Sequence, residues 1–543
     1  MKQRRARTSA VRPTRIALLT LCFSIGLLWT TTAQAGKFKF KWGGEIGSSL
    51  FLGLQPQTDF IRENNLGNLF NYRNTNQITL KLQPRFGRKI AGRANIEFRN
   101  LNFSPGMALT DQPNALGKPS SDLEDYNRVL PVSVRVNELY MDFYGIIPNV
   151  DLRIGQQRIA WGTATVFNPT DNLNPYNLEN PVDFQQRLGV PAIKLDITAG
   201  EYVTISLIDV FMFTPPVLPI SLFRQATTID TSVLVPDGFK LGSINSTEIV
   251  ELPLFDVTNM IPAAKVAVNL DVINFSASYV YGRTYIPAPT QVPITGVSIN
   301  TGEQNIPIIQ GANPDAIKLV SCLEPNRATP CEVNASAENV RLVFPRVHIV
   351  GLDFSTSLGG VGFWAEAALF IPAETVDTRF TLPQFLIDGM EIIDTNLKNK
   401  IAQPLRTFKA EPYVKITAGL DYTFPGGWYF NLQYLYGFFN EQAWDELHHY
   451  AILAFRKSFF RDKLLIQLSA GMEVDTQRTE KEKEDGNQVG LGFIINPEIH
   501  YKPADAATII LGGIITRGHE GTTLRLFQAL TQVYLRAKFT FGG

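Results

Sequence analysis

A run of histidines and carboxylates carries the side chains best suited to acid–base or metal chemistry. The chain has five histidines among 543 residues, and two of them stand together in Asp445-Glu446-Leu447-His448-His449. In an extended strand His448 and His449 point to opposite faces, so they do not easily bind one ion. No phosphate-binding glycine loop and no HExxH, GxSxG or CxxC motif occurs in the sequence. We therefore predict no metal site, no cofactor and no enzymatic activity, and interpret the run as a polar loop tip.

The first 35 residues have the features of an export signal. A basic start is followed by an apolar run from Ile16 to Trp29 and by Ala33-Gln34-Ala35, a small-x-small cleavage pattern. The apolar run is too short to span a membrane comfortably, which makes an N-terminal anchor the weaker alternative. We predict cleavage after Ala35 and export by the general secretory route.

The charge balance does not favour a nucleic-acid partner. Six of the 50 Lys and Arg residues precede residue 36, which leaves 44 basic against 50 acidic residues and a balance of −6. A nucleic-acid-binding domain usually carries a basic surface, so we predict no such partner.

Alternation of apolar and polar residues in blocks of about ten is the main structural signal. It is clearest from Tyr413 to Tyr436, where two alternating segments flank the turn Pro425-Gly426-Gly427. Aromatic residues, including Tyr422 and Trp428, bracket the aliphatic part of the apolar face, as they do at lipid interfaces. A soluble sandwich would alternate without this bracketing, so the pattern favours a transmembrane β-barrel.

Short and long connections alternate along the chain. The pattern predicts short turns near 87–92, 146–150, 199–202, 271–274, 359–361, 425–428, 458–463 and 502–506. It predicts long loops at 55–71, 103–131, 162–190, 214–261, 286–343 and 372–410, with shorter loops near 441–447, 476–489 and 517–525. Short turns on the periplasmic side and long loops outside are typical of outer-membrane barrels. We predict one all-β domain over residues 36–543, an antiparallel barrel of about 18 strands, with about 16 as the alternative.

Charged residues on the predicted inner face would line the lumen. They are Arg93, Glu97, Arg99, Arg135, Arg153, Lys194, Lys265, Arg346, Glu366, Lys415 and Arg536. Basic residues outnumber acidic ones in this set, which favours a lumen that prefers anions. An alternative, held equally open, is that these charges pair across neighbouring strands and stabilise the barrel.

Two kinds of loop are candidates for shaping a pore. One follows the strand of Arg153 and contains Trp161, expected at the outer lipid interface, and Asn168 and Asp171, expected to hydrogen-bond an inward-turning backbone. The other kind is apolar and comprises segments 215–223 and 380–387, which would promote aggregation if freely exposed. We expect at least one apolar segment to fold into the mouth, with Phe380 and Phe385 as constricting residues in the second. Packing against other loops as a cap is the alternative.

Cys322 and Cys331 are the cysteines that remain after cleavage. They lie close together in an exported chain, in a proline-containing loop with no histidine nearby to complete a zinc site. We predict that they form a disulfide.

Two stretches resemble a known family. Arg153 to Asp171 contains the pattern R-I-G-Q-Q-x-x-x-W-G-x4-F-N-P-x-D, and Gly351 to Ala367 reads G-L-D-F-S-T-S-L-G-G-V-G-F-W-A-E-A. Both are similar to stretches of porin-like proteobacterial outer-membrane proteins that are mostly catalogued as a domain of unknown function. The resemblance implies an outer-membrane barrel and leaves the substrate open, with hydrophobic compounds as one class to consider.

These patterns together predict an outer-membrane channel for the passive passage of small solutes, with hydrophobic compounds and anions as candidates. The expected partners are outer-membrane lipid and lipopolysaccharide, the barrel-assembly machinery and the solute. One alternative is a barrel plugged by its loops that acts as a receptor or envelope interaction protein. A second is an outer-membrane hydrolase with a catalytic histidine at its rim.

Overall fold

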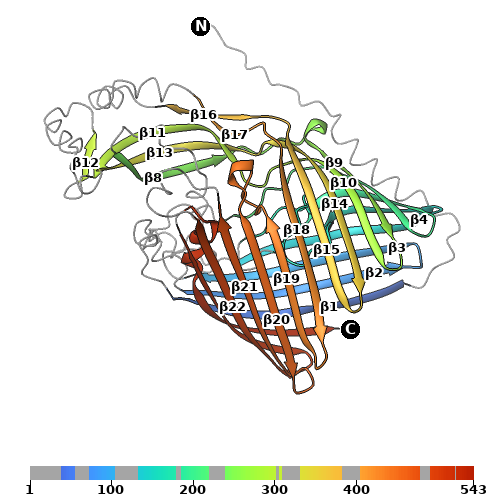
Figure 1. The fold of residues 1–543 in the computed structure, drawn as a ribbon. Coiled ribbons are helices and arrows are strands. Elements are labelled where there is room, and N and C mark those ends of the chain that lie inside the picture. The colour runs from blue at the N-terminus through green and yellow to red at the C-terminus, as the bar shows by residue number, and fades with distance from the viewer. Residues whose placement is uncertain are drawn as a thin grey trace, which may run out of the picture.

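The computed structural model describes residues 38–54, 72–103, 132–178, 185–218, 239–300, 305–308, 331–381, 404–476, 489–519 and 521–542. The predicted signal peptide and its cleavage site lie outside these residues. Most of the described chain is strand, arranged as a closed barrel with a second sheet beside one end of it (Figure 1).

Eighteen antiparallel strands form the barrel wall, which confirms the fold class and the strand count predicted from the sequence. Each wall strand pairs with the next one along the chain, and the wall closes where β1 pairs with β24, with Glu45 opposite Thr540. The wall strands are β1 (Phe38–Gly53), β2 (Tyr72–Phe86), β3 (Ile90–Phe103), β4 (Val132–Ile147), β5 (Val150–Gln157), β6 (Val190–Ala199), β7 (Val203–Val210), β9 (Ile261–Asn269), β10 (Ile273–Arg283), β14 (Arg346–Leu358), β15 (Val361–Pro372), β18 (Tyr413–Phe424), β19 (Trp428–Tyr436), β20 (His449–Phe459), β21 (Leu464–Asp475), β22 (Gly490–Ala504), β23 (Ala507–Gly518) and β24 (Gln532–Gly542).

Tight turns join the wall strands at one end of the barrel and long connections join them at the other. The predicted short turns and long loops fall between consecutive wall strands. The turn between β18 and β19 shows how the residues determine the geometry. Gly426 and Gly427 have φ values of 91° and 80°, a region that glycine adopts without steric cost.

The outer face of the wall is apolar. Along β18, Ile416 and Leu420 are more exposed than the alternating Lys415 and Thr417, which are buried on the inner face. The same alternation leaves large apolar side chains exposed around the barrel, among them Ile78, Phe98, Val134, Leu207, Val266, Leu352, Leu468, Leu511 and Leu535. Exposing apolar surface to water costs about 25 cal/mol per Å². The outer face is therefore suited to an apolar surrounding.

A second sheet forms within the long connections, where the sequence pattern predicts only loops. It consists of β8 (Phe239–Val250), β11 (Ala288–Asn300), β12 (Asn305–Ile308), β13 (Cys331–Val343), β16 (Val376–Thr381) and β17 (Leu405–Phe408). This sheet projects sideways from the barrel (Figure 1), and its pairs β8–β13 and β11–β16 are parallel. Alternation is a poor guide here because β11 contains Pro289 and Pro293 and pairs with β13 through register shifts.

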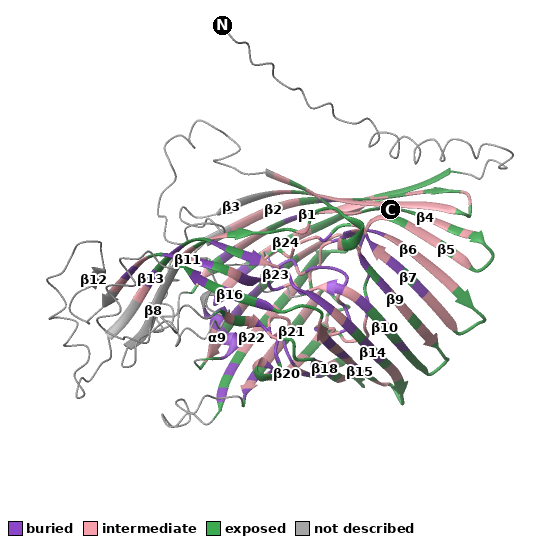
Figure 2. Cartoon of the chain, turned by 90° about the horizontal axis from the view of Figure 1, so that it is seen from above, coloured by how far each residue is buried: buried purple, intermediate pink, exposed green. Residues whose placement is uncertain are grey.

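The helices in the described residues are short: α9 (Thr523–Leu526) and the 3-10 helices η5 (Val257–Asn259), η7 (Trp444–Glu446) and η8 (Phe527–Leu530). None of the described helices has the length and apolar character needed to cross a membrane. Buried residues alternate with exposed ones along many wall strands and recur on the connections folded against them (Figure 2). The largest apolar clusters therefore lie where connections pack on the inner wall.

Candidate functional site

The connection between β5 and β6 turns into the barrel, and we call its residues 158–178 the inward loop. Ile159, Trp161 and Leu173 of this loop are buried in one cluster with inner-wall residues such as Ala192 and Ala368. Alanine leaves room beside the wall for these larger side chains. The inward loop thus occupies part of the lumen and carries Asn168 and Asp171 with it.

Glu366, on the inner face of β15, holds the inward loop to the wall. Its carboxylate accepts hydrogen bonds from the backbone N–H groups of Thr163 and Ala164, the latter at 2.6 Å, and from the Thr170 hydroxyl at 2.8 Å. The residue is 2% exposed, and a buried carboxylate is unfavourable unless such donors surround it. Because all of these donors belong to the inward loop, the loop and the carboxylate stabilise each other.

Gln433 on β19 makes a second attachment to the inward loop. Its Oε1 accepts from the Thr165 hydroxyl at 3.1 Å and from the Val166 N–H at 3.2 Å. Its Nε2 donates to the Phe167 carbonyl at 3.2 Å and to the Thr417 hydroxyl of β18 at 2.9 Å. The wall thus orients the amide so that it bonds both donors and acceptors of the loop.

Polar side chains also fold the inward loop back on itself. Arg158 donates to both carboxylate oxygens of Asp171 and to Asn174 Oδ1 at 2.9 Å. Asn168 Nδ2 donates to the Trp161 carbonyl at 3.3 Å. Asn168 and Asp171, both singled out in the sequence, therefore bond within the loop that contains them.

Trp161 lies inside the barrel and not at the outer lipid interface, where the sequence pattern predicts it. It is 5% exposed and packs in the cluster of Ile159 and Leu173, with Lys265 Nζ 5.9 Å from its ring centroid. The prediction is wrong because β5 ends at Gln157. Beyond that residue the alternation of the strand no longer determines which way Trp161 points.

We predict that Gly162→Ala displaces the inward loop. Gly162 has a φ of 91°, and a Cβ there would lie 2.6 Å from Glu366 Oε1 and 2.7 Å from Asn168 Nδ2. A left-handed backbone alone costs a residue with a Cβ about 1–2 kcal/mol. Hydrogen exchange of residues 158–178 should become faster, while the barrel strands keep their protection.

Gly145→Ala is the matched control for this substitution. Gly145 has a φ of 59°, and a Cβ there would have no atom within 4 Å. The control should lose the stability that a left-handed alanine costs, but it should not displace the inward loop. Equal exchange of residues 158–178 in the two variants would contradict the contact with Glu366.

Two further connections pack against the inward loop. The one between β19 and β20 contributes Phe438, whose ring centroid lies 4.5 Å from that of Phe167. The one between β23 and β24 contributes the helical residues Leu524 and Phe527. We call the shared apolar group the loop cluster; it consists of Phe167, Leu178, Leu435, Phe438, Tyr450, Leu524, Leu526, Phe527 and Leu530.

One of the two apolar segments reaches the inward loop. Val217 donates its backbone N–H to the Tyr176 carbonyl at 3.0 Å, and Leu218 packs on the loop cluster. Residues 219–223 lie outside the described residues. Phe380 differs from the expectation because it lies on β16 opposite Val292, in the second sheet. Phe385 lies outside the described residues.

A cavity of about 50 Å³ lies between the inward loop and the wall. A space of this size can hold a few water molecules. Burial raises the pKa of the hydroxyl groups of Tyr176 and Tyr285 in its lining, so both rings stay neutral. The charged and aromatic lining residues are Phe167, Tyr176, Arg283, Tyr285, Phe370, Tyr413, Lys415, Phe438 and Phe439.

Most of the basic residues predicted to line the lumen lie beside carboxylates. Arg153 is 2.6 Å from Asp142, the shortest of these pairs. This arrangement favours the structural alternative, in which the charges stabilise the wall. The other pairs are Arg93–Glu138 at 2.8 Å, Arg99–Glu97 at 3.0 Å, Lys194–Asp196 at 2.7 Å and Lys265–Asp353 at 3.3 Å. Arg135 lies opposite Glu97 in the strand register, and the Arg536 guanidinium lies 4.3 Å from the Tyr534 ring centroid.

Arg346 lies on the outer face of β14, which contradicts its prediction as a lumen residue. Leu352, on the same face, is 58% exposed, whereas Val347 is buried on the inner face. The Arg346 guanidinium donates to the Met260 carbonyl at 3.1 Å and lies 4.9 Å from the Tyr281 ring centroid. The prediction is wrong because it places the apolar Val347 in lipid and therefore its neighbour Arg346 inside. Val347 instead packs on the connections inside the barrel.

Gln433 and the acidic partners Asp142 and Asp353 are not among the site residues predicted from the sequence. Alternation could have found all three, because each lies on the inward-facing side of a regular strand. It could not have identified their partners. The predicted disulfide stays a prediction, since Cys331 begins β13 and Cys322 lies outside the described residues.

No protein-family model matches the chain, and no curated protein matches it by sequence. The resemblance to a porin-like family therefore stays a prediction. Among solved structures the chain is similar to OccK5 (OpdH) of Pseudomonas aeruginosa, with 8% identity, 93% of this chain and 98% of that chain covered, and a TM-score of 0.45. It is also similar to OccAB1 of Acinetobacter baumannii, with 7% identity, 95% and 98% covered, and a TM-score of 0.46.

A third similar structure is Pseudomonas aeruginosa OpdK with vanillate. Its sequence is 8% identical, the match covers 93% of this chain and 99% of that chain, and the TM-score is 0.45. The closed 18-stranded barrel is established by the strand pairing of the chain itself.

Proposed function

We propose that the protein is an outer-membrane channel for the passive passage of small solutes, with the inward loop as its constriction. The observation that carries this proposal is a barrel wall that is apolar outside and holds the inward loop through Glu366 and Gln433 inside. An apolar exterior suits lipid, and barrels of 16–18 strands are wide enough for an aqueous path. A loop that folds into such a lumen limits the width of that path.

Hydrophobic compounds and anions are the solutes that suit the cavity best. Its aromatic rings offer apolar contact, and Lys415 Nζ lies 5.4 Å from the Phe370 ring centroid and 5.8 Å from that of Tyr413. The Lys415 ammonium donates to the Phe438 carbonyl, whereas most of the other predicted lumen cations form ion pairs with carboxylates. Selectivity would therefore depend on the charge at this cavity more than on the number of basic residues in the wall.

Lys415→Met should weaken the preference for anions. Methionine is flexible enough to keep the packing of the lysine stem while removing its charge. In planar bilayers with a salt gradient, the wild-type reversal potential should indicate anion preference, and the variant should shift it towards cations. Lys538→Met is the control, because Lys538 lies 3.7 Å from Glu45 near the short-turn end of the wall. Cation preference of the wild type would contradict the anionic part of the proposal.

A plugged barrel is the second candidate, favoured by the packing of three connections into the loop cluster. Such a barrel would serve as a receptor or envelope interaction protein. Liposome swelling separates the two candidates, because a channel admits small sugars and a plugged barrel does not. A rim hydrolase has less support: His449 faces outward, with Nδ1 2.7 Å from the Tyr434 hydroxyl. Hydrolytic activity that is lost in His449→Ala would favour it.

The location and the partners belong to the same proposal. Cleavage after Ala35, secretory export and insertion by the barrel-assembly machinery would place the apolar outer face in lipid, with lipopolysaccharide around the loop end. Cell fractionation and N-terminal sequencing of the mature protein test these steps. Recovery of the protein in another compartment would overturn them.

A further inference from the structure

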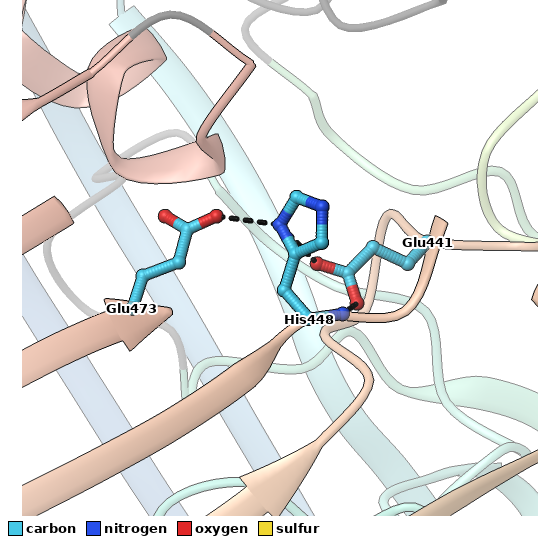
Figure 3. A group of neighbouring side chains, drawn as sticks. All are labelled: Glu441, His448 and Glu473. Atoms are coloured by element: carbon cyan, nitrogen blue, oxygen red, sulfur yellow. Dashed lines mark hydrogen bonds and ion pairs between the residues drawn. The ribbon is translucent and has the colours of Figure 1, made fainter. Parts of the chain in front are cut away.

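Three potential metal ligands converge beside the loop cluster. Glu441 and His448 lie in the connection between β19 and β20, and Glu473 lies on β21 (Figure 3). One ligand atom from each residue lies within 4.8 Å of the other two. The side chains are 3%, 11% and 0% exposed, so the group is shielded from bulk solvent.

Backbone amides orient both carboxylates. Glu441 Oε2 accepts from the N–H groups of Phe438 at 2.7 Å and His448 at 3.1 Å. Glu473 Oε2 accepts from the Leu524 N–H at 2.7 Å. The other oxygen of each carboxylate faces His448 Nδ1, at 3.7 Å for Glu441 Oε1 and 2.7 Å for Glu473 Oε1. Both carboxylates are thus held with one oxygen directed at the same imidazole nitrogen.

A third carboxylate lies behind the imidazole. His448 Nε2 is 3.4 Å from Asp475 Oδ1. A carboxylate that accepts from one ring nitrogen fixes the proton there and leaves the other nitrogen with a lone pair, which is the usual arrangement around a metal-binding histidine. Asp475 is placed to hold the imidazole proton on Nε2 when a cation replaces the 2.7 Å hydrogen bond between His448 Nδ1 and Glu473 Oε1.

The charges of the group also favour a cation. Three carboxylates surround one imidazole, and buried carboxylates are unfavourable unless positive charge or hydrogen-bond donors accompany them. A protonated His448 would supply one positive charge, and a divalent cation would supply two. In a tetrahedral Zn²⁺ site, bond lengths of about 2.0–2.1 Å place neighbouring ligand atoms about 3.3 Å apart. The observed distances of 2.7 Å and 3.7 Å lie on either side of that value.

We propose that Glu441 Oε1, His448 Nδ1 and Glu473 Oε1 bind one divalent transition-metal ion, with Zn²⁺ as the first choice. Imidazole and carboxylate together are a ligand set that Zn²⁺ accepts. The Tyr450 hydroxyl donates to Glu441 Oε1 and lies 3.3 Å from Glu473 Oε1, so it contacts both of the proposed carboxylate ligands. This site goes beyond the channel proposal and does not depend on it.

Such an ion would join two connections to the wall. Glu441 and His448 belong to the connection after β19. Glu473 accepts from the Thr523 N–H at 2.7 Å as well as from the Leu524 N–H, so it also holds the start of α9 in the connection before β24. Binding should therefore stabilise both connections at once. The site is not apparent in the sequence because Glu441 and Glu473 lie outside the run 445–449.

Zinc titration of the purified full-length protein tests the proposal. The protein in detergent, stripped with a chelator and dialysed, should bind one Zn²⁺ per chain and unfold at a higher temperature with it. Glu441→Gln keeps the shape of the side chain but not its charge, and His448→Ala removes the imidazole. Loss of an outer-shell partner typically weakens metal binding about 10–100-fold, so loss of either ligand should weaken Zn²⁺ binding at least about 100-fold.

His500→Ala is the matched control, because His500 Nε2 lies 3.0 Å from Glu498 on β22 in a second inward histidine–glutamate pair. This variant should bind Zn²⁺ as the wild type does. Circular dichroism and heat-modifiable gel migration verify that each variant is folded. No saturable Zn²⁺ binding by the wild type, or unchanged binding by folded Glu441→Gln, would overturn the site.

Discussion

Replacing Glu366 with alanine should release the inward loop and raise the single-channel conductance. The change removes the acceptor for the Thr163 and Ala164 N–H groups and the Thr170 hydroxyl. Hydrogen bonds to charged groups contribute about 1.5–3 kcal/mol each, so the free energy needed to open the loop should fall by roughly 3–5 kcal/mol. Bilayer recordings should show larger and noisier currents, and hydrogen exchange of residues 158–178 should accelerate.

Two variants make this test specific. Glu366→Gln keeps one acceptor oxygen and nearly the same shape, so its conductance should lie between those of the wild type and the alanine variant. Glu138→Ala removes another inner-face carboxylate, the partner of Arg93, and should change conductance little. If Glu366→Ala accelerates exchange without changing conductance, the inward loop is not the constriction. If exchange is also unchanged, Glu366 does not hold the loop.

Replacing Phe527 with alanine should loosen all three connections that share the loop cluster. Phe527 is 1% exposed, and a Phe→Ala change in a packed core typically costs about 3–5 kcal/mol. The space left by the missing ring would lie where the connection before β24 meets the connections that carry Phe167 and Phe438. Hydrogen exchange should therefore accelerate in residues 521–531 and also in 158–178 and 437–448.

A double-mutant cycle measures this coupling. Phe527→Ala and Phe167→Ala together should lose less stability than the sum of the single changes, because the two side chains share one cluster. Phe539→Ala on the outer face is the control, since that side chain is 49% exposed and should affect the connections little. Exchange that accelerates only in residues 521–531 would mean that the connections open independently.

The barrel was predictable because each wall strand separates two different surroundings. Between Tyr413 and Tyr436 the alternation shows which residues face outward, and the glycines at 426 and 427 mark the turn. The second sheet was not predictable in this way. Its strands pair with segments from other connections, and the prolines in β11 interrupt the pattern that alternation requires.

The contacts of the inward loop depend on distances that alternation does not contain. Strand alternation suggests that Glu366 faces the lumen, but its partner Thr163 is 203 residues away in the sequence. Which segment reaches that carboxylate depends on the width of the barrel and the path of the loop. The face on which Arg346 lies was also not predictable, because the inner wall becomes apolar wherever connections pack against it. Polarity alone then no longer distinguishes the inside from the outside.

The parallel pairs of the second sheet impose an order on folding. β8 and β13 belong to different connections, and their register places Phe239 opposite Cys331; likewise Gln291 of β11 lies opposite Arg379 of β16. Parallel strands cannot be joined by a tight turn, and closing such long segments costs more chain entropy than forming adjacent hairpins. Pairing of β9, β10, β14 and β15 in the wall brings the ends of these connections together, so less chain remains to be closed. The second sheet should therefore fold late, on a wall that has already assembled.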